Sequence, residues 1–184
     1  PAVAYNSRHD EYLVVWGDPY DIYARRIGSR GTSLGPITPI ATETAREDNP
    51  DVAYDPLQDR YLVVWDNVNA NDDKDIGGRF VPWDLSGPFP ASFSIEGGLG
   101  FYSVYPRLAY MPGQASGWGE FLVVWLNAQP SPGTPFHAGR RVNADGSGFG
   151  GVSFPIGTVA GTTWPCHQPP DVTANPANQE YLVV

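Results

Sequence analysis

The stretch that decides the fold is Tyr61-Leu62-Val63-Val64-Trp65, an unbroken apolar run between polar turns. Because apolar residues follow one another without alternation, the run predicts a strand that is buried on both faces, unlike a strand with one face in water. Similar runs recur at residues 12–16, 121–125 and 181–184.

Each of these runs is the second segment of a longer repeat. The repeat opens with Pro-x-Val-Ala-Tyr or a close variant, at residues 1, 50, 106 and 170. Val, Ile, Tyr, Trp and Leu in short runs between turn residues favour strands over helices. Four strands per repeat are therefore predicted, the third at 21–27, 75–81 and 136–142 and the fourth at 37–41, 91–95 and 152–156.

The turn residues fit this arrangement. The proline that opens each repeat suits the start of a strand, where the missing N–H costs no ladder hydrogen bond. Asn6-Ser7, Asp55-Pro56, Met111-Pro112-Gly113 and Asn175-Pro176 then follow the first segments. These residues tolerate or pre-set turn dihedrals, so the first and second strands are predicted to form hairpins.

We therefore predict an all-β chain, a partial β-propeller of about three and a half four-stranded antiparallel blades. The predicted units are 1–49, 50–105 and 106–169, with 170–184 as the first two strands of a fourth blade, all within one propeller domain. Immunoglobulin-like sandwiches need about 100 residues per domain and alternating strands. That fold and other β-solenoids remain the rival interpretations.

The repeat resembles a family found in secreted and surface-exposed bacterial proteins. The resemblance rests on Pro-x-Val-Ala-Tyr, Tyr-Leu-Val-Val-Trp, Asp-Ile-Tyr-x-x-Arg-Ile/Val and a Gly turn, and it covers essentially the whole chain. It is best in the first repeat, from Tyr12 to Ile27, whereas the third repeat has Phe136 and His137 in place of Asp-Ile. The resemblance implies propeller blades and an extracellular or cell-surface location, but no catalytic residue.

Three and a half blades are fewer than the 4–8 of a closed ring. We therefore expect the chain to be an excerpt of a longer polypeptide. The alternative is that chains associate and complete one another, because an exposed apolar edge invites strand pairing. Further copies or the remaining blades of the same protein are thus candidate partners, together with a glycan or a protein.

Composition excludes several functional classes. The 184 residues carry 20 acidic and 11 basic side chains, for a net charge of −9. No basic field is present for nucleic acid or an anionic membrane, and no apolar stretch is long enough to span a membrane. The single cysteine, Cys166, excludes an intrachain disulfide and multi-cysteine metal sites.

One acidic loop is the candidate metal site. Its oxygen donors are of the type that Ca²⁺ prefers, but it lacks the glycine and the closing glutamate of an EF-hand, and Lys74 lies among the donors. A solvated hairpin rich in turn residues would look the same, and no other cofactor is predicted. The candidate calcium ligands are Asp66, Asn67, Asn69, Asn71, Asp73 and Asp75.

Aromatic residues outside the repeated strands are the candidate ligand-binding residues. Tyr20, Trp83, Trp118 and Trp164 lie beside Gly and Pro in predicted loops. Flat rings in such loops could stack on sugars or anchor a protein partner. They could equally fold back over the ends of the blades, since large aromatic residues are mostly buried.

Charged residues give no catalytic constellation. An arginine recurs in each third segment, at 25 or 26, 79, and 140 or 141, and this repetition favours packing or ion pairing over a shared anion site. Glu43, Glu47, Glu96 and Glu120 are scattered through turns, so sequence cannot pair them as a glycosidase would require. Cys166 and His167 are adjacent in an extended segment and would point to opposite sides.

We therefore expect a non-enzymatic extracellular β-propeller segment that mediates glycan or protein binding or surface assembly. The alternatives are a glycosidase- or lyase-type hydrolase with a loop-built site on one propeller face, and a structural subunit of a surface polymer. A cleft that holds two close carboxylates would favour the hydrolase.

Overall fold

The computed structural model describes the chain except residues 44–45, 69–72, 98–101, 114–116, 129–133 and 159–168. The described residues form sheets whose strands pair antiparallel, apart from one parallel pair between Lys74 and Tyr102, and none of them forms a helix. Blade 1 consists of β1 (Ala2–Asn6), β2 (Glu11–Asp18), β3 (Asp21–Gly28) and β4 (Ser33–Ala41). Blade 2 consists of β5 (Arg46–Asp55), β6 (Arg60–Val68), β7 (Lys74–Pro82) and β8 (Phe93–Glu96). Blade 3 consists of β9 (Tyr102–Met111), β10 (Glu120–Ala128), β11 (Phe136–Asn143) and β12 (Phe154–Thr158), and β13 (Val172–Asn175) pairs with β14 (Glu180–Val183).

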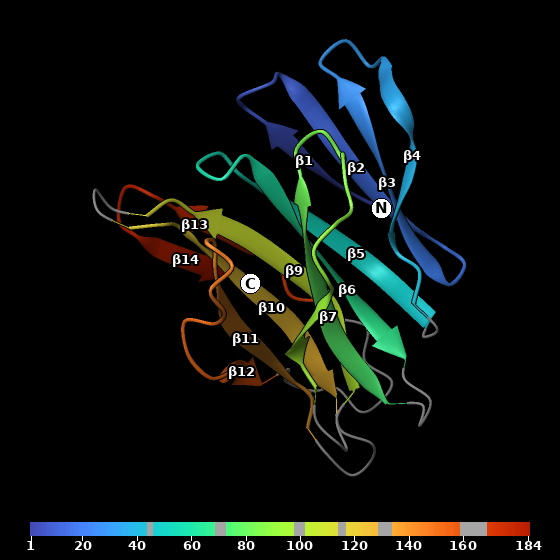
Figure 1. Cartoon of the computed structure of the whole chain (residues 1–184). Helices are drawn as coiled ribbons and strands as arrows, with labels where there is room; N and C mark the ends of the chain where they lie inside the picture. The colour runs from blue at the N-terminus through green and yellow to red at the C-terminus, as the bar shows by residue number, and fades with distance from the viewer. Residues whose placement is uncertain (44–45, 69–72, 98–101, 114–116, 129–133, 159–168) are drawn as a thin grey trace.

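The blades are arranged as a fan (Figure 1). The first strands lie next to one another, with β5 in contact with β1 and β9, and β13 in contact with β9. The outer strands of each blade splay away from this inner row. The prediction of an all-β chain built from four-stranded propeller blades is confirmed.

Two apolar layers fill the spaces between blades. In β6 the alternate residues Tyr61, Val63 and Trp65 pack into the layer with blade 1, while Leu62 and Val64 pack into the layer with blade 3. All five are at most 2% exposed. Burial of each such side chain contributes about 1.5–3 kcal/mol before entropy is subtracted. The prediction of strands buried on both faces therefore holds for β6, and β10 follows the same pattern.

The second strand of blade 1 departs from this prediction, and so does β14, where Leu182 is 62% exposed. Leu13 and Val15 are fully buried, but Tyr12 is 37% exposed and Val14 is only half-buried. The reason is that blade 2 covers one face of blade 1, and no other described blade covers the opposite face. We call Val3, Tyr5, Tyr12 and Val14 the open face of blade 1; Val3 pairs with Val14 and Tyr5 with Tyr12 across the two strands.

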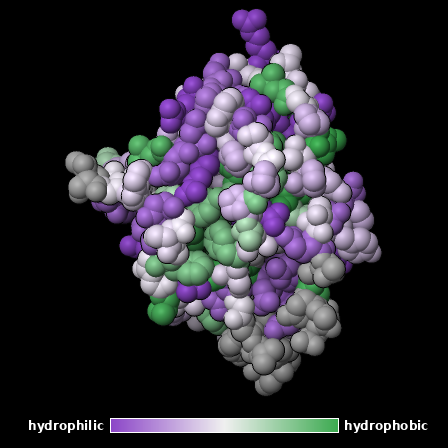
Figure 2. Space-filling model, in the orientation of Figure 1, coloured by the Kyte–Doolittle hydropathy of each residue, from purple (hydrophilic) through white to green (hydrophobic). Residues whose placement is uncertain are grey.

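The surface drawn in Figure 2 is mostly polar. In the view of Figure 2, hydrophilic residues dominate the outline of the molecule and apolar residues gather toward its middle. In the described part of the chain no helix is long and apolar enough to cross a membrane.

The prediction that the repeat prolines start strands holds for two of the four: Pro1 and Pro170 come just before β1 and β13, whereas Pro50 and Pro106 lie inside strands. Pro50 and Pro106 lie within β5 and β9, beside register shifts in the pairing with β6 and β10. The preceding residues, Asn49 and Tyr105, have φ values of 51° and 57°. A β-bulge leaves one residue outside the ladder, so the missing proline N–H costs no hydrogen bond there.

The predicted hairpins between first and second strands are confirmed, and they use the same side-chain chemistry. The Asn6 carboxamide oxygen accepts hydrogen bonds from the amides of Arg8 and His9, at 3.0 and 3.1 Å. The Asp55 carboxylate does the same for Leu57, at 2.8 Å. Such side-chain acceptors stabilise the turn by satisfying amides that the ladder leaves unpaired.

The recurring arginine joins each blade to the one before it. Arg79 donates a hydrogen bond to the carbonyl of Ile40, and Arg140 donates to the carbonyl of Ile95 at 2.7 Å. Ile40 and Ile95 lie in the fourth strand of the preceding blade. The packing interpretation of these arginines is therefore confirmed. The corresponding Arg25 has a buried Nε atom with no hydrogen-bond partner among the described residues.

Candidate functional site

A cavity of about 380 Å³ opens where three hairpins meet at one end of the blades. These are the β9–β10 and β11–β12 hairpins of blade 3 and the β13–β14 hairpin. We call it the Trp118 pocket. Its lining residues are Met111, Pro112, Gly113, Trp118, Gly119, Glu120, Asn143, Asp145 and Gln179.

Trp118 supplies a large aromatic surface, and its residue is 62% exposed. The following residue fixes the course of the loop. A Cβ atom at Gly119 would lie 2.5 Å from the hydroxyl of Tyr110 and 2.5 Å from the carbonyl of Met111, so only glycine fits there. The Gly119 carbonyl accepts a hydrogen bond from the amide of Ala144 at 2.9 Å. The Trp118 loop is thereby tied to the β11–β12 hairpin.

Two carboxylates line the pocket. Glu120 begins β10, and its Oε1 lies 3.6 Å from Nη1 of Arg141 on the neighbouring strand. Asp145 lies in the turn after β11, where its Oδ1 accepts a hydrogen bond from the Ser147 amide at 2.8 Å. Hydrogen bonds from the Ser147 hydroxyl and amide hold the pKa of Asp145 below its usual value. Asp145 is therefore ionised near neutral pH.

Two carboxamides complete the polar lining. Asn143 donates to the Ser147 hydroxyl at 3.1 Å, and Gln179 donates to the Pro176 carbonyl at 3.0 Å. The Tyr181 hydroxyl donates to the Glu120 carbonyl at 3.3 Å, which joins β14 to β10. The pocket thus presents an aromatic ring, two carboxylates and two amides on three mutually tied hairpins.

Sequence reasoning found only part of this site. Trp118 was predicted as a ligand-binding residue, and Glu120 was noted without a partner. Asn143, Asp145 and Gln179 were missed because no spacing in the sequence relates these three turns. The polar residues clustered at 143–147 were the only available signal, and such clusters are ordinary turn formers.

The other aromatic candidates do not join Trp118. Tyr20 is 60% exposed in the β2–β3 turn, at the opposite end of its blade from the β1–β2 hairpin, and the guanidinium carbon of Arg46 lies 5.9 Å from its ring centroid. Trp83 is half-buried and stacks on the His9 ring with centroids 3.6 Å apart. Trp164 lies outside the described residues. These placements leave the three as untested candidates.

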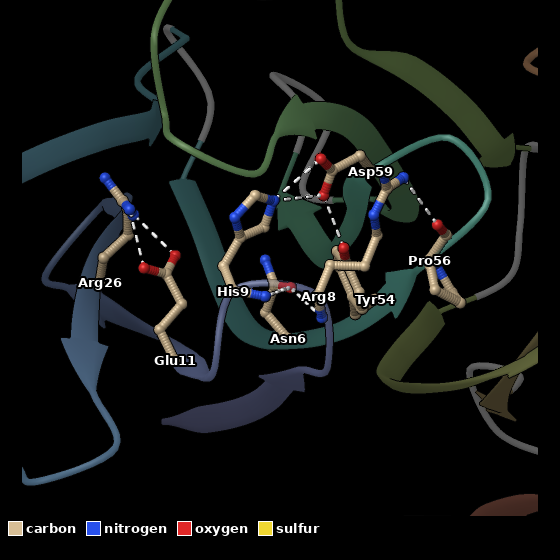
Figure 3. Close-up of polar contacts among 8 residues, drawn as sticks. All are labelled: Asn6, Arg8, His9, Glu11, Arg26, Tyr54, Pro56 and Asp59. Atoms are coloured by element: carbon tan, nitrogen blue, oxygen red, sulfur yellow. Dashed lines mark hydrogen bonds and ion pairs between the residues drawn. The ribbon is translucent and has the colours of Figure 1, made fainter.

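A polar network that the sequence did not reveal surrounds His9 (Figure 3). His9 Nε2 lies 2.9 Å from Asp59 Oδ2, and the Tyr54 hydroxyl donates to Asp59 Oδ1 at 2.6 Å. Burial, and then the hydrogen bond to Asp59, raise the pKa of Tyr54. Within blade 1, Arg26 forms a two-point ion pair with Glu11, at 2.8 and 2.7 Å. These contacts fasten blade 1 to blade 2 and brace the third strand of blade 1.

The predicted calcium loop is only partly described, because Asn69 and Asn71 lie outside the described residues. Asp66 is fully buried and accepts hydrogen bonds from the Asn49 side chain and the Tyr105 amide, both at 2.9 Å. Burial raises the pKa of Asp66. Among the residues that the structure describes, no three His, Cys, Asp or Glu side chains are grouped to hold a metal. Calcium binding by Asp66, Asn67, Asp73 and Asp75 stays a prediction.

A second group of carboxylates lies near the start of β5. Glu47 is 1% exposed, and its Oε2 has no hydrogen-bond partner in the described structure. Burial, and then the negative charges of Glu43 and Asp21, raise the pKa of Glu47 to about 7. Glu43 itself pairs with Arg79 at 2.6 Å. Glu43 and Glu47, which the sequence left scattered, thus interact across the junction of blades 1 and 2.

Comparison with known proteins supports the fold. The sequence matches no protein-family model and no curated protein. One similar solved structure is the endo-1,5-alpha-L-arabinanase from Thermotoga petrophila RKU-1, with a TM-score of 0.50 and 16% identity over 85% of this chain and 42% of that chain. Another is the endo-arabinase from Bacteroides thetaiotaomicron VPI-5482, with a TM-score of 0.34 and 9% identity over 100% of this chain and 87% of that chain. The chain therefore spans less than half the length of the first of these proteins.

The first of these structures corrects the expected function. The prediction of a non-enzymatic binding or assembly segment is contradicted, because the Thermotoga petrophila structure is an endo-1,5-alpha-L-arabinanase, which agrees better with the hydrolase alternative. The bacterial repeat family suggested by the sequence is not confirmed, but the propeller fold is shared with the endo-1,5-alpha-L-arabinanase.

Proposed function

We propose that this chain forms part of a glycosidase-type hydrolase that acts on a polysaccharide. The observation that carries the proposal is the Trp118 pocket, which combines an exposed aromatic ring with two carboxylates. The propeller fold shared with an endo-arabinanase is consistent with it. The proposal keeps the extracellular or cell-surface location expected from the sequence, where the enzyme would meet a polymer too large to enter the cell.

Hydrolysis of a glycosidic bond requires two carboxyl groups with different roles. Asp145 fits the role that requires a charge, because the hydrogen bonds from Ser147 keep it ionised. In the proposed reaction it takes a proton from water as the hydroxide oxygen bonds to the anomeric carbon. Glu120 is the second carboxyl group of the pocket, and when it carries a proton it donates that proton to the leaving glycosidic oxygen as the C–O bond breaks. Solvent exchange returns both carboxyl groups to their starting states.

Trp118 would position the sugar. The apolar face of a sugar ring stacks on an indole ring, and the remaining hydroxyl groups need polar partners. The side chains of Asn143 and Gln179 line the same cavity and offer amide donors and acceptors to a substrate.

The test is release of reducing ends by the 184-residue chain from a panel of polysaccharides that includes arabinan. Glu120→Gln and Asp145→Asn should each lower the rate at least about 100-fold, because each removes one half of the acid–base pair. Asp18→Asn, an exposed carboxylate at the end of β2, is the control and should leave the rate unchanged.

Two results would contradict the proposal. One is the absence of release from every polysaccharide of the panel by the unmodified chain. The other is release that survives both the Glu120 and the Asp145 substitutions.

A further inference from the structure

The charged side chains that line the Trp118 pocket are both acidic. Glu120 and Asp145 line it, and its described lining contains no Lys, Arg or His residue. A ligand in the pocket therefore meets two carboxylates without a cation in the lining.

The nearest arginines compensate this charge only in part. Arg141 lies 3.6 Å from Glu120, and its side chain is 51% exposed, so water and salt screen the pair. Arg60 donates to the carbonyl of Ala144, and its guanidinium lies 4.0 Å from the ring centroid of Phe80. Hydrogen bonds from Ser147, and then the positive charge of Arg60, lower the pKa of Asp145, so Arg60 compensates part of the charge of that carboxylate.

An aromatic face beside carboxylates is the chemistry that recognises an ammonium group. The indole ring attracts a cation through its quadrupole, and it does so more strongly than the rings of Tyr or Phe. Carboxylates add charge-assisted hydrogen bonds from the N–H groups of the cation. A neutral hydroxyl group has no cation–π attraction to the ring, and its hydrogen bonds to the carboxylates are weaker than those of an ammonium group. An anionic sugar is repelled by both carboxylates.

From the composition of this pocket we infer that its preferred ligand is a sugar chain with a protonated amino group. The inference rests on the proposed function, whose substrate class it specifies. It distinguishes three related polymers by charge: an amino sugar, its N-acetylated form and a uronic acid.

Isothermal titration of the intact chain with oligosaccharides of equal length tests the inference. The ligands are oligomers of glucosamine, of N-acetylglucosamine and of galacturonic acid, at about pH 5.5, where an amine is protonated. We expect the glucosamine oligomer to bind about tenfold more tightly than the N-acetylated one. The galacturonic acid oligomer should bind most weakly, and raised salt should reduce the difference.

Variants identify the groups responsible. Trp118→Ala should weaken all binding, whereas the double variant Glu120→Gln, Asp145→Asn should bind the amino and N-acetylated oligomers equally. Asp18→Asn is again the control, and circular dichroism verifies that each variant is folded. Equal or tighter binding of the N-acetylated or acidic oligomer by the unmodified chain would overturn the inference.

The binding test is independent of turnover. A preference for the amino sugar without reducing-end release from any polymer would leave this inference standing and remove the hydrolase. Reducing-end release without the preference would do the reverse.

Discussion

At the scale of single residues, Glu47 is a buried side chain whose protonation state affects the stability of the fold. Its carboxyl group is buried beside Glu43 and Asp21, and one oxygen has no hydrogen-bond partner among the described residues. A buried carboxylate without a partner is costly, whereas the neutral acid is tolerated. The folded protein therefore holds a proton that the unfolded chain releases.

This difference predicts a pH dependence of stability. The folded pKa is raised to about 7 from an ordinary value of 4.5, so the stabilising contribution is complete below pH 4.5. It is lost as the pH rises through 7, by up to about 3 kcal/mol. Glu47→Gln keeps the shape of the side chain and removes the proton, so the variant should lose less stability over this interval.

Urea unfolding at pH 5 and pH 8 measures the effect. The quantity compared is the change in unfolding free energy with pH for the unmodified chain minus that for Glu47→Gln. Asp51 and Asp66, whose pKa values burial also raises, are present in both proteins and cancel. Identical pH dependences would show that Glu47 titrates normally.

At the scale of strands, the structure separates what an amino-acid pattern can predict from what it cannot. The apolar runs of β6 and β10 predict their own burial, because a strand between two blades has no polar face. The bulges before Pro50 and Pro106 were missed, since a proline at a strand start and a proline at a bulge are equally free of ladder bonds.

Fourth strands were predicted with less accuracy than second strands. The sequence placed them at 91–95 and 152–156, whereas β8 and β12 span 93–96 and 154–158. These outer strands are short and partly exposed, so turn chemistry and hydrophobic pattern constrain their ends weakly. The Trp118 pocket was beyond prediction for a related reason, because Glu120, Asp145 and Gln179 meet only through the pairing of separate hairpins.

The hydrogen bond from the repeated arginine to the preceding blade can be tested by the same substitution at equivalent positions of two blades. Arg140→Met should destabilise the chain by about 1–3 kcal/mol, because it removes a charge-assisted hydrogen bond to a buried carbonyl. Arg25→Met at the equivalent position should cost less, since no described carbonyl accepts from Arg25. Chemical denaturation of both variants provides the comparison, and equal losses would argue against the link.

At the scale of the molecule, the same repeat residue has a different environment in different blades. Tyr5 and Tyr12 on the open face of blade 1 are 49% and 37% exposed. Their equivalents in blade 2, Tyr54 and Tyr61, are 8% and 0% exposed because blade 1 covers them. The contribution of a repeated side chain to the stability of the fold therefore depends on whether a neighbouring blade covers it.

Substitution of matched tyrosines measures that coverage. Tyr61→Ala should cost about 3–5 kcal/mol through the lost burial and the cavity left behind. Tyr12→Ala should cost about 1 kcal/mol or less, as is usual for a partly exposed position. Thermal melting of the two variants measures both stability losses. Equal losses would show that the tyrosine contributes the same stability in both blades.

The arginine links also have a direction. Each one runs from the third strand of a blade back to a carbonyl in the blade that precedes it in the sequence. During synthesis on the ribosome the acceptor strand of each link is made before the arginine that donates to it, so we expect each blade to fold onto the blade before it. We expect pulse-labelled hydrogen exchange to show protection spreading from the N-terminal sheet toward the C-terminal one, and simultaneous protection of all blades would exclude such vectorial growth.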